Sequence, residues 1–148
     1  MAITLQTATL SAEFSYISLY DEAMDTESKG FPEAFEKYRE GAIDMPPLKE
    51  GIEPTIWTLK PPASAKLKGM MDDVMMKHGQ KTWAITYAAF CIKGVTGLDD
   101  EDGSPLELKF VRHLGYEMLC EEHTNLIGAE ILREIGSRVI KHTQPSKT

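Results

Sequence analysis

GVTGLDDEDGSPLEL, residues 94–108, divides this chain, because it lies between two segments with a helical pattern. Glycine, proline and a run of acidic residues are typical of an exposed turn. Beyond its carboxylates the stretch offers no catalytic group. We therefore interpret it as a joint between helices rather than as an active site.

The acidic run within this joint, Asp99–Gly103, resembles a calcium-binding loop in composition but not in spacing. When Gly103 is aligned with the glycine at position six of such a loop, Leu98 falls on position one and Lys109 on position twelve. Both positions need an oxygen ligand. The sequence therefore predicts no tight metal site here, and Asp102–Gly103 is expected to form a left-handed turn.

Before the joint, apolar residues recur at three- and four-residue steps, which predicts two helices. The first is expected to begin after Ser64, a suitable N-cap, and to end at Gly79. The second covers residues 83–91 and is expected to end at Gly94 and Gly97.

After the joint, residues 105–119 and residues 125–140 are predicted to form further helix. The last helix carries one apolar stripe: Leu126, Ile127, Ile131, Ile135 and Val139.

The amino-terminal half has a different character, because residues 1–62 hold six of the eight prolines. Aromatic and β-branched residues predict strands at residues 14–19 and 54–59, which are expected to pair as a small antiparallel sheet. A short helix is predicted over residues 32–39, with Pro32 in its first turn.

Together these elements predict one mostly helical α+β domain over residues 1–148, with about four to five helices. Within it, residues 1–62 form the irregular, strand-bearing part, residues 63–141 the helical part, and residues 142–148 a flexible tail.

The net charge of −7 argues against nucleic acid and anionic membranes as partners, because both attract basic surfaces. No apolar run approaches the roughly twenty residues of a membrane span. The first residues lack the pattern of a secretory signal, so the expected location is the cytoplasm, with Cys91 and Cys120 reduced.

Catalytic and cofactor motifs are missing from the sequence. There is no glycine-rich phosphate loop and no nucleophile beside a base. Cys120 and His123 are spaced as in some zinc half-sites, but too few further ligands are present for a complete site. We expect a protein that is not an enzyme and that has no cofactor and no metal.

Four of the eight methionines fall within seven residues, which suits either loose core packing or an adaptable binding face. Adjacent methionines on a helix point in different directions, so at least one is expected to meet solvent or a partner. The candidate protein-binding residues are Trp57, Met70, Met71, Met75 and Met76.

Four motifs resemble those of small tail assembly proteins of tailed bacteriophages and prophages, the chaperone-like family. They are an acidic opener at residues 21–25, the strand segment EGIEPTIWTLKP at residues 50–61, the joint at residues 94–108, and the segment AEILREI at residues 129–135. Two departures are Pro61-Pro62 after the strand and Leu98 in place of an aromatic residue.

The resemblance implies a non-catalytic α+β protein of the host cytoplasm that self-associates into a homo-oligomer. It implies binding to the tape measure protein, to tail tube subunits, or to both, during assembly of the viral tail. Two alternatives remain open: a structural tail or connector subunit of the virion, and an acidic inhibitor of a host nucleic-acid-binding protein.

Overall fold

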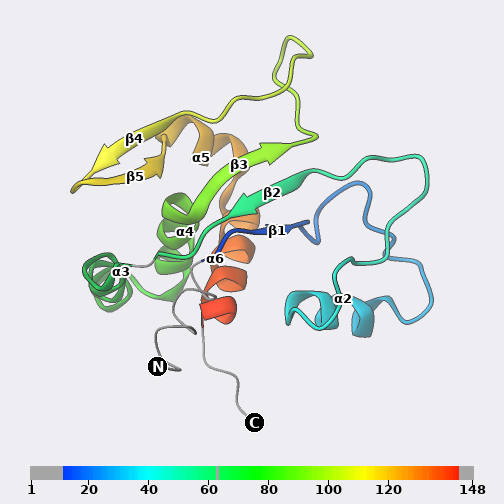
Figure 1. Ribbon diagram of the computed structural model, residues 1–148, viewed down its shortest axis with the longest axis horizontal. Coiled ribbons are helices and arrows are strands. Elements are labelled where there is room, and N and C mark those ends of the chain that lie inside the picture. The colour runs from blue at the N-terminus through cyan, green and yellow to red at the C-terminus, as the bar shows by residue number, and fades with distance from the viewer. Residues whose placement is uncertain (1–11, 63, 144–148) are drawn as a thin grey trace.

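A three-stranded antiparallel sheet collects three distant parts of the chain (Figure 1). The structure is a computed structural model that describes residues 12–62 and 64–143. The strands are β1 (Phe14–Tyr16), β2 (Ile56–Leu59) and β3 (Ile92–Thr96), with β2 in the centre. A separate two-stranded hairpin consists of β4 (Phe110–His113) and β5 (Tyr116–Leu119).

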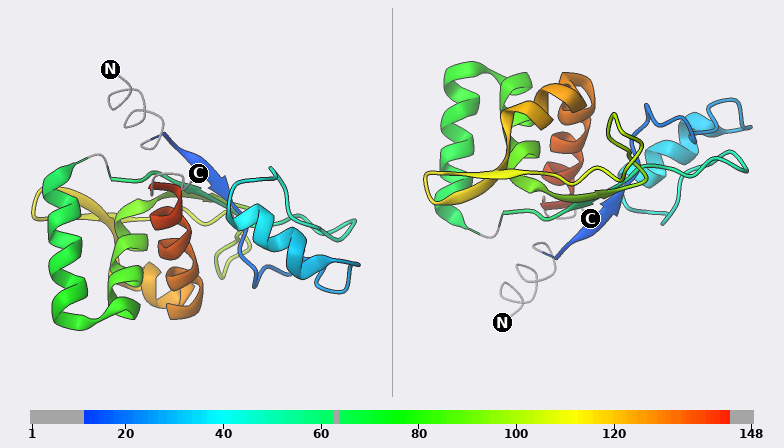
Figure 2. Two further views of the ribbon diagram at one scale, coloured as in Figure 1. Left: turned by 90° about the horizontal axis from the view of Figure 1, so that it is seen from below. Right: turned by 90° about the horizontal axis from the view of Figure 1, so that it is seen from above.

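Within the described residues, five helices accompany the strands. They are α2 (Phe31–Arg39), α3 (Ala65–His78), α4 (Gln80–Cys91), α5 (Glu121–Ile127) and α6 (Ala129–Thr143). The helices α3, α4 and α6 lie side by side, and α2 stands apart from them (Figure 2). The predicted mostly helical α+β domain with a small antiparallel sheet is confirmed. None of the helices in this part of the chain has the length and apolar character to cross a bilayer.

The sheet buries one face. Tyr16 pairs with Trp57 across β1 and β2, and the alternation of side chains along a strand places Leu59 on the same face. All three side chains are buried, whereas Ser15, on the opposite face, is exposed. The two strands predicted in the amino-terminal half therefore pair as expected, although β1 is shorter than predicted.

Local signals placed the first helices correctly. The α2 helix carries Pro32 in its first turn, where a missing N–H removes no helical hydrogen bond. The Ser64 hydroxyl caps α3 by accepting a hydrogen bond from the main-chain N–H of Leu67 at 3.2 Å. Gly79 ends α3 with a φ of 89°, a value that favours glycine.

The chain that follows α4 corrects one prediction. Gly94 was expected to end a helix, but it lies within β3 and faces Thr58 of β2. The run Ile92–Thr96 contains three β-branched residues, a composition that favours a strand. The sheet thus takes its third strand from the part of the chain predicted to be only helical, and the two parts form one core.

The helix predicted over residues 105–119 is also wrong, because this segment forms the β4–β5 hairpin. Its two-residue turn is Leu114-Gly115, with φ of 54° and 89°. Two successive positive φ values are typical of a type I′ turn, which matches the twist of paired strands.

The helix predicted over residues 125–140 is two helices in the structure. Gly128, with a φ of 92°, separates α5 from α6. Ile135 and Val139 of the predicted stripe are buried as expected, but Leu126 is 65% exposed. The predicted tail begins inside α6, which extends to Thr143, and residues 144–148 lie outside the described residues.

Candidate functional site

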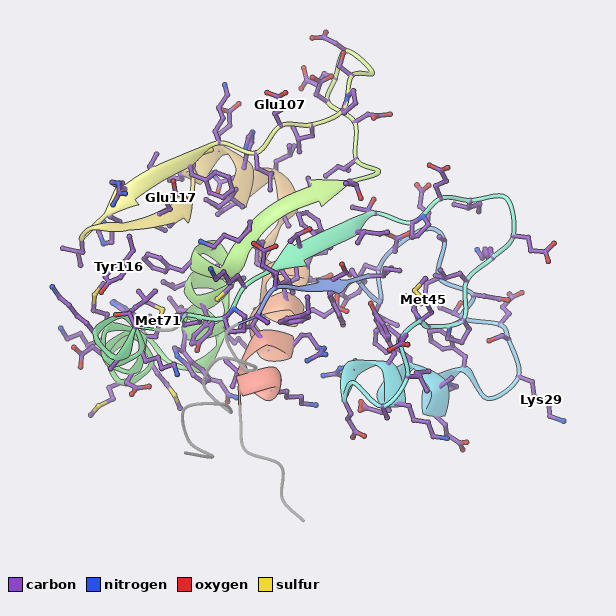
Figure 3. The ribbon with its side chains drawn as sticks, viewed as in Figure 1. Lys29, Met45, Met71, Glu107, Tyr116 and Glu117 are labelled. Carbon is purple, nitrogen blue, oxygen red and sulfur yellow. The ribbon has the colours of Figure 1, made fainter. Side chains whose placement is uncertain are left out.

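The four clustered methionines of α3 have different environments. Met71 is buried where α3 faces the β4–β5 hairpin, near Tyr116 (Figure 3). Met70 is partly buried against the same core. Met75 and Met76 are exposed, to 43% and 86% of their surface. The prediction that at least one of these methionines meets solvent is confirmed, and only Met75 and Met76 of the four offer a largely open surface.

Trp57 does not join the methionines. It lies in the central strand β2 and is 3% exposed. Its side chain packs in the core, and the residue is also among those that line a groove to which α3 contributes no residue. The five predicted binding residues are therefore divided between the core, the outer side of α3 and this groove.

The groove has a volume of about 460 Å³ and is lined by side chains from five separate segments. These are residues 18–22 after β1, residues 53–57 leading into β2, residues 97–99 after β3, residues 126–127 of α5, and Ile131 of α6. We call it the acidic groove, because of its rim.

Several residues that line the acidic groove are apolar, and we call this apolar part of the lining its floor. Leu126 is 65% exposed, and Leu98, Ile127 and Ile131 are half-buried beside it. The break at Gly128 gives α5 and α6 separate axes, so that α5 carries Leu126 away from the core that α6 helps to form. The result is an apolar surface that the domain does not cover.

Four residues that line the acidic groove carry carboxylates, and we call this acidic part of the lining its rim. Glu22, Glu53 and Asp99 are exposed, and Asp21 is half-buried. No lysine, arginine or histidine is present among the described residues that line it. The groove thus combines an uncovered apolar floor with a rim of one charge sign.

Hydrogen bonds fix the walls of the groove. The Asp21 carboxylate accepts from the main-chain N–H of Ala23 at 2.9 Å and from that of Thr55 at 2.8 Å. The Thr55 hydroxyl donates to the carbonyl of Gly97 at 3.2 Å. A Cβ atom on Gly97 would lie 2.6 Å from the carbonyl oxygen of Pro54, so glycine allows this close approach. Three distant segments are therefore held in one arrangement.

A second hollow of about 330 Å³ lies between α2 and α6 and contains Arg39, Arg133 and Glu134. Two of its charged groups, Arg39 and Glu134, have partners within the protein. Arg39 pairs with Glu36 at 3.1 Å. The Glu134 carboxylate accepts from the Tyr16 hydroxyl at 2.6 Å, from the main-chain N–H of Leu19 at 2.7 Å and from the hydroxyl of Ser18. The hydrogen bonds of Glu134 join the amino-terminal segment to α6 beside this hollow.

The possible metal ligands have structural roles. Cys120 is the N-cap of α5, and His123 is buried with its Nδ1 accepting a hydrogen bond from the main-chain N–H of Lys109 at 3.1 Å. In the acidic turn, Asp100 accepts from the main-chain N–H groups of Asp102 and Ser104. Within residues 12–62 and 64–143, no group of three His, Cys, Asp or Glu residues could hold a metal ion.

Sequence reasoning missed the acidic groove. Its residues come from segments more than one hundred positions apart, and no local motif connects them. The available signal was Gly128, a residue type that commonly ends a helix, which would have separated Leu126 from the residues of α6.

The chain was compared with protein-family models, with curated proteins and with solved structures, and none of them matches it. The resemblance to tail assembly proteins is therefore a prediction, and function must be argued from the geometry of the domain.

Proposed function

We propose that this protein is a non-catalytic tail assembly chaperone-like protein, which binds the tape measure protein, tail tube subunits, or both, while a phage tail is built. The acidic groove is the observation that carries the proposal. An uncovered apolar floor enclosed by a polar rim is typical of a surface that docks another protein. The helix-rich α+β fold agrees with what the resemblance implies.

Leu126 is central to this proposal. A leucine that exposes 65% of its surface at a helix position loses apolar contact with water when a partner covers it. Leu98, Ile127 and Ile131 lie around it and would exclude water from the same contact.

Met75 and Met76 supply a second, weaker contact region on α3. Flexible thioethers adapt to more than one apolar surface, which suits a long client whose sequence varies along its length. Self-association of the protein along such a client would add many weak contacts and raise the overall affinity without one strong site.

The test is co-expression with a candidate tape measure protein. We expect the soluble fraction of the client to rise, and the two proteins to be purified together. The variant Leu126→Asn should reduce the co-purified client roughly tenfold, because it removes apolar contact from the centre of the floor.

Leu114→Asn is the matched control. Leu114 is also 65% exposed, but it lies at the tip of the β4–β5 hairpin and not in the groove. It should leave co-purification unchanged. Equal losses for the two variants, or a client whose solubility does not respond to co-expression, would contradict the proposal.

A further inference from the structure

We infer that the acidic groove accepts one face of a basic amphipathic helix, with apolar side chains on the floor and lysine or arginine side chains against the rim. The inference rests on the proposed function only in taking the groove as a protein-binding surface. It adds the secondary structure and the charge of the segment that binds.

The groove presents side chains rather than free main-chain groups. Trp57 is the one residue of its lining that belongs to a described strand, and β2 is paired on both sides, by β1 and by β3. An extended peptide that adds a strand needs an unpaired edge. A helix needs only apolar side chains at three- and four-residue spacing, and the groove is suited to those contacts.

The floor determines which face of the helix enters. Leu126, Ile127 and Ile131 come from the two helices on one side, and Leu98 comes from the loop after β3. These aliphatic side chains favour leucine, isoleucine or methionine on the incoming helix, since contacts between such groups remove apolar surface from water without leaving a polar group unpaired.

The rim determines the charge. Glu22 lies in the segment after β1, Glu53 in the segment before β2, and Asp99 in the segment after β3. All three side chains are exposed. Asp21 adds a fourth carboxylate, whose two oxygens are held by main-chain N–H groups and therefore remain fixed in position. A partner with acidic flanks would be repelled, whereas lysine or arginine flanks would be attracted.

The acidic turn reinforces this preference. Asp100, Glu101 and Asp102 directly follow the rim residue Asp99 and are all exposed. The Asp100 carboxylate orders the turn through hydrogen bonds to two main-chain N–H groups. The second hollow differs, because its two arginines, Arg39 and Arg133, are matched in number by the carboxylates of Glu130 and Glu134, so that its lining has no net charge.

The experiment measures binding of two synthetic peptides by fluorescence anisotropy. Both are helices of about five turns with the same leucine and isoleucine stripe; one carries lysine at its flanking positions and the other carries glutamate. We expect the lysine peptide to bind at least about tenfold more tightly at low salt, and the difference to shrink as salt screens the exposed carboxylates.

The triple variant Glu22→Gln, Glu53→Gln, Asp99→Asn should remove most of the preference for the lysine peptide. A matched triple variant, Asp72→Asn, Asp73→Asn, Glu117→Gln, makes the same change in net charge at exposed positions outside the groove and should keep the preference. Thermal unfolding and circular dichroism establish that both variants are folded.

Each outcome decides the inference. Equal binding of the two peptides, or an equal loss of preference in both triple variants, overturns it and leaves a groove that binds protein without regard to charge. Failure of both peptides to bind, while the co-expressed client is still solubilised, overturns it and leaves the proposed function standing. If the client is not solubilised but the lysine peptide binds in the groove, the inference stands and the proposed function fails.

Discussion

Gly136 of α6 lies directly against the main-chain carbonyl of Ala84 in α4. A Cβ atom at position 136 would stand 2.0 Å from that carbonyl oxygen and 2.7 Å from its carbon. The two helices therefore cross at a distance that only glycine permits, and the close packing of α4 on α6 depends on this one position.

Gly136→Ala should lower the free energy of unfolding by about 2 to 3 kcal/mol, because the added methyl group forces the two helices apart. Urea unfolding measures this loss. Gly69→Ala in α3 is the control, since a Cβ atom there meets nothing within 4 Å. It should raise the stability by about 0.5 to 1 kcal/mol through better helix propensity. A stable Gly136→Ala protein would show that the helices are not so closely packed.

Glu134→Gln should lower the stability by about 1 to 3 kcal/mol, because an amide NH₂ replaces one of the oxygens that accept from Tyr16, Ser18 and Leu19. Glu130→Gln, at an exposed position of the same helix, should change it by less than about 0.5 kcal/mol. Urea unfolding of the two variants at neutral pH compares them. Similar small effects would mean that the three hydrogen bonds add little to stability.

Alkaline pH should destabilise the fold. Burial raises the pKa of Cys91 to about 12, and burial together with the neighbouring Glu134 raises the pKa of Tyr16 above its ordinary value of 10.0. Both groups ionise at lower pH in the unfolded chain, so unfolding releases protons. The stability is therefore fully present below about pH 9, the ordinary pKa of a thiol, and falls as the pH rises toward 12.

Tyr16→Phe tests the origin of this fall. The variant should be less stable at pH 8, having lost its bond to Glu134, but its stability should decrease less steeply above pH 10. Tyr20→Phe, at a residue that is 57% exposed, should leave the slope unchanged. Urea unfolding between pH 8 and pH 11 gives the slopes. Parallel curves for Tyr16→Phe and the parent protein would exclude Tyr16 as a cause.

Leu114→Asn should stabilise the β4–β5 hairpin. A leucine with a φ of 54° is strained, whereas asparagine adopts this conformation readily and is common in type I′ turns. The expected gain is about 0.5 to 1 kcal/mol in thermal or urea unfolding. Gly115→Ala should act in the opposite direction, because its φ is 89°. A loss of stability in Leu114→Asn would show that the leucine makes contacts that outweigh the strain.

The sequence predicts those parts of the fold that have strong local signals. Ser64 and Gly79 mark both ends of α3, and Pro32 marks the start of α2. The hairpin segment was predicted as helix, although it contains Phe110, Val111 and Tyr116, residue types that favour strands. A leucine at the first turn position concealed the turn, because asparagine or aspartate is the usual marker.

The candidate site was beyond local reasoning. Trp57 was predicted correctly as a strand residue, but its burial depends on β1, β3 and the helices that cover the sheet. Leu126 was assigned to the apolar stripe of one long helix, but the helix ends at Gly128 and the Leu126 side chain is exposed. Properties that depend on several distant segments cannot be predicted from the pattern of any one of them.

The hydrogen bond between Tyr16 and Glu134 also limits how early the protein can finish folding during translation. The first strand and its aromatic partners are made early, but the carboxylate that fixes them is 118 residues farther along the chain. Until that helix leaves the ribosome, the nascent chain cannot complete its core. During this interval the aromatic residues of the amino-terminal segment are exposed. Prompt synthesis of the remaining chain, including α6, protects them from aggregation.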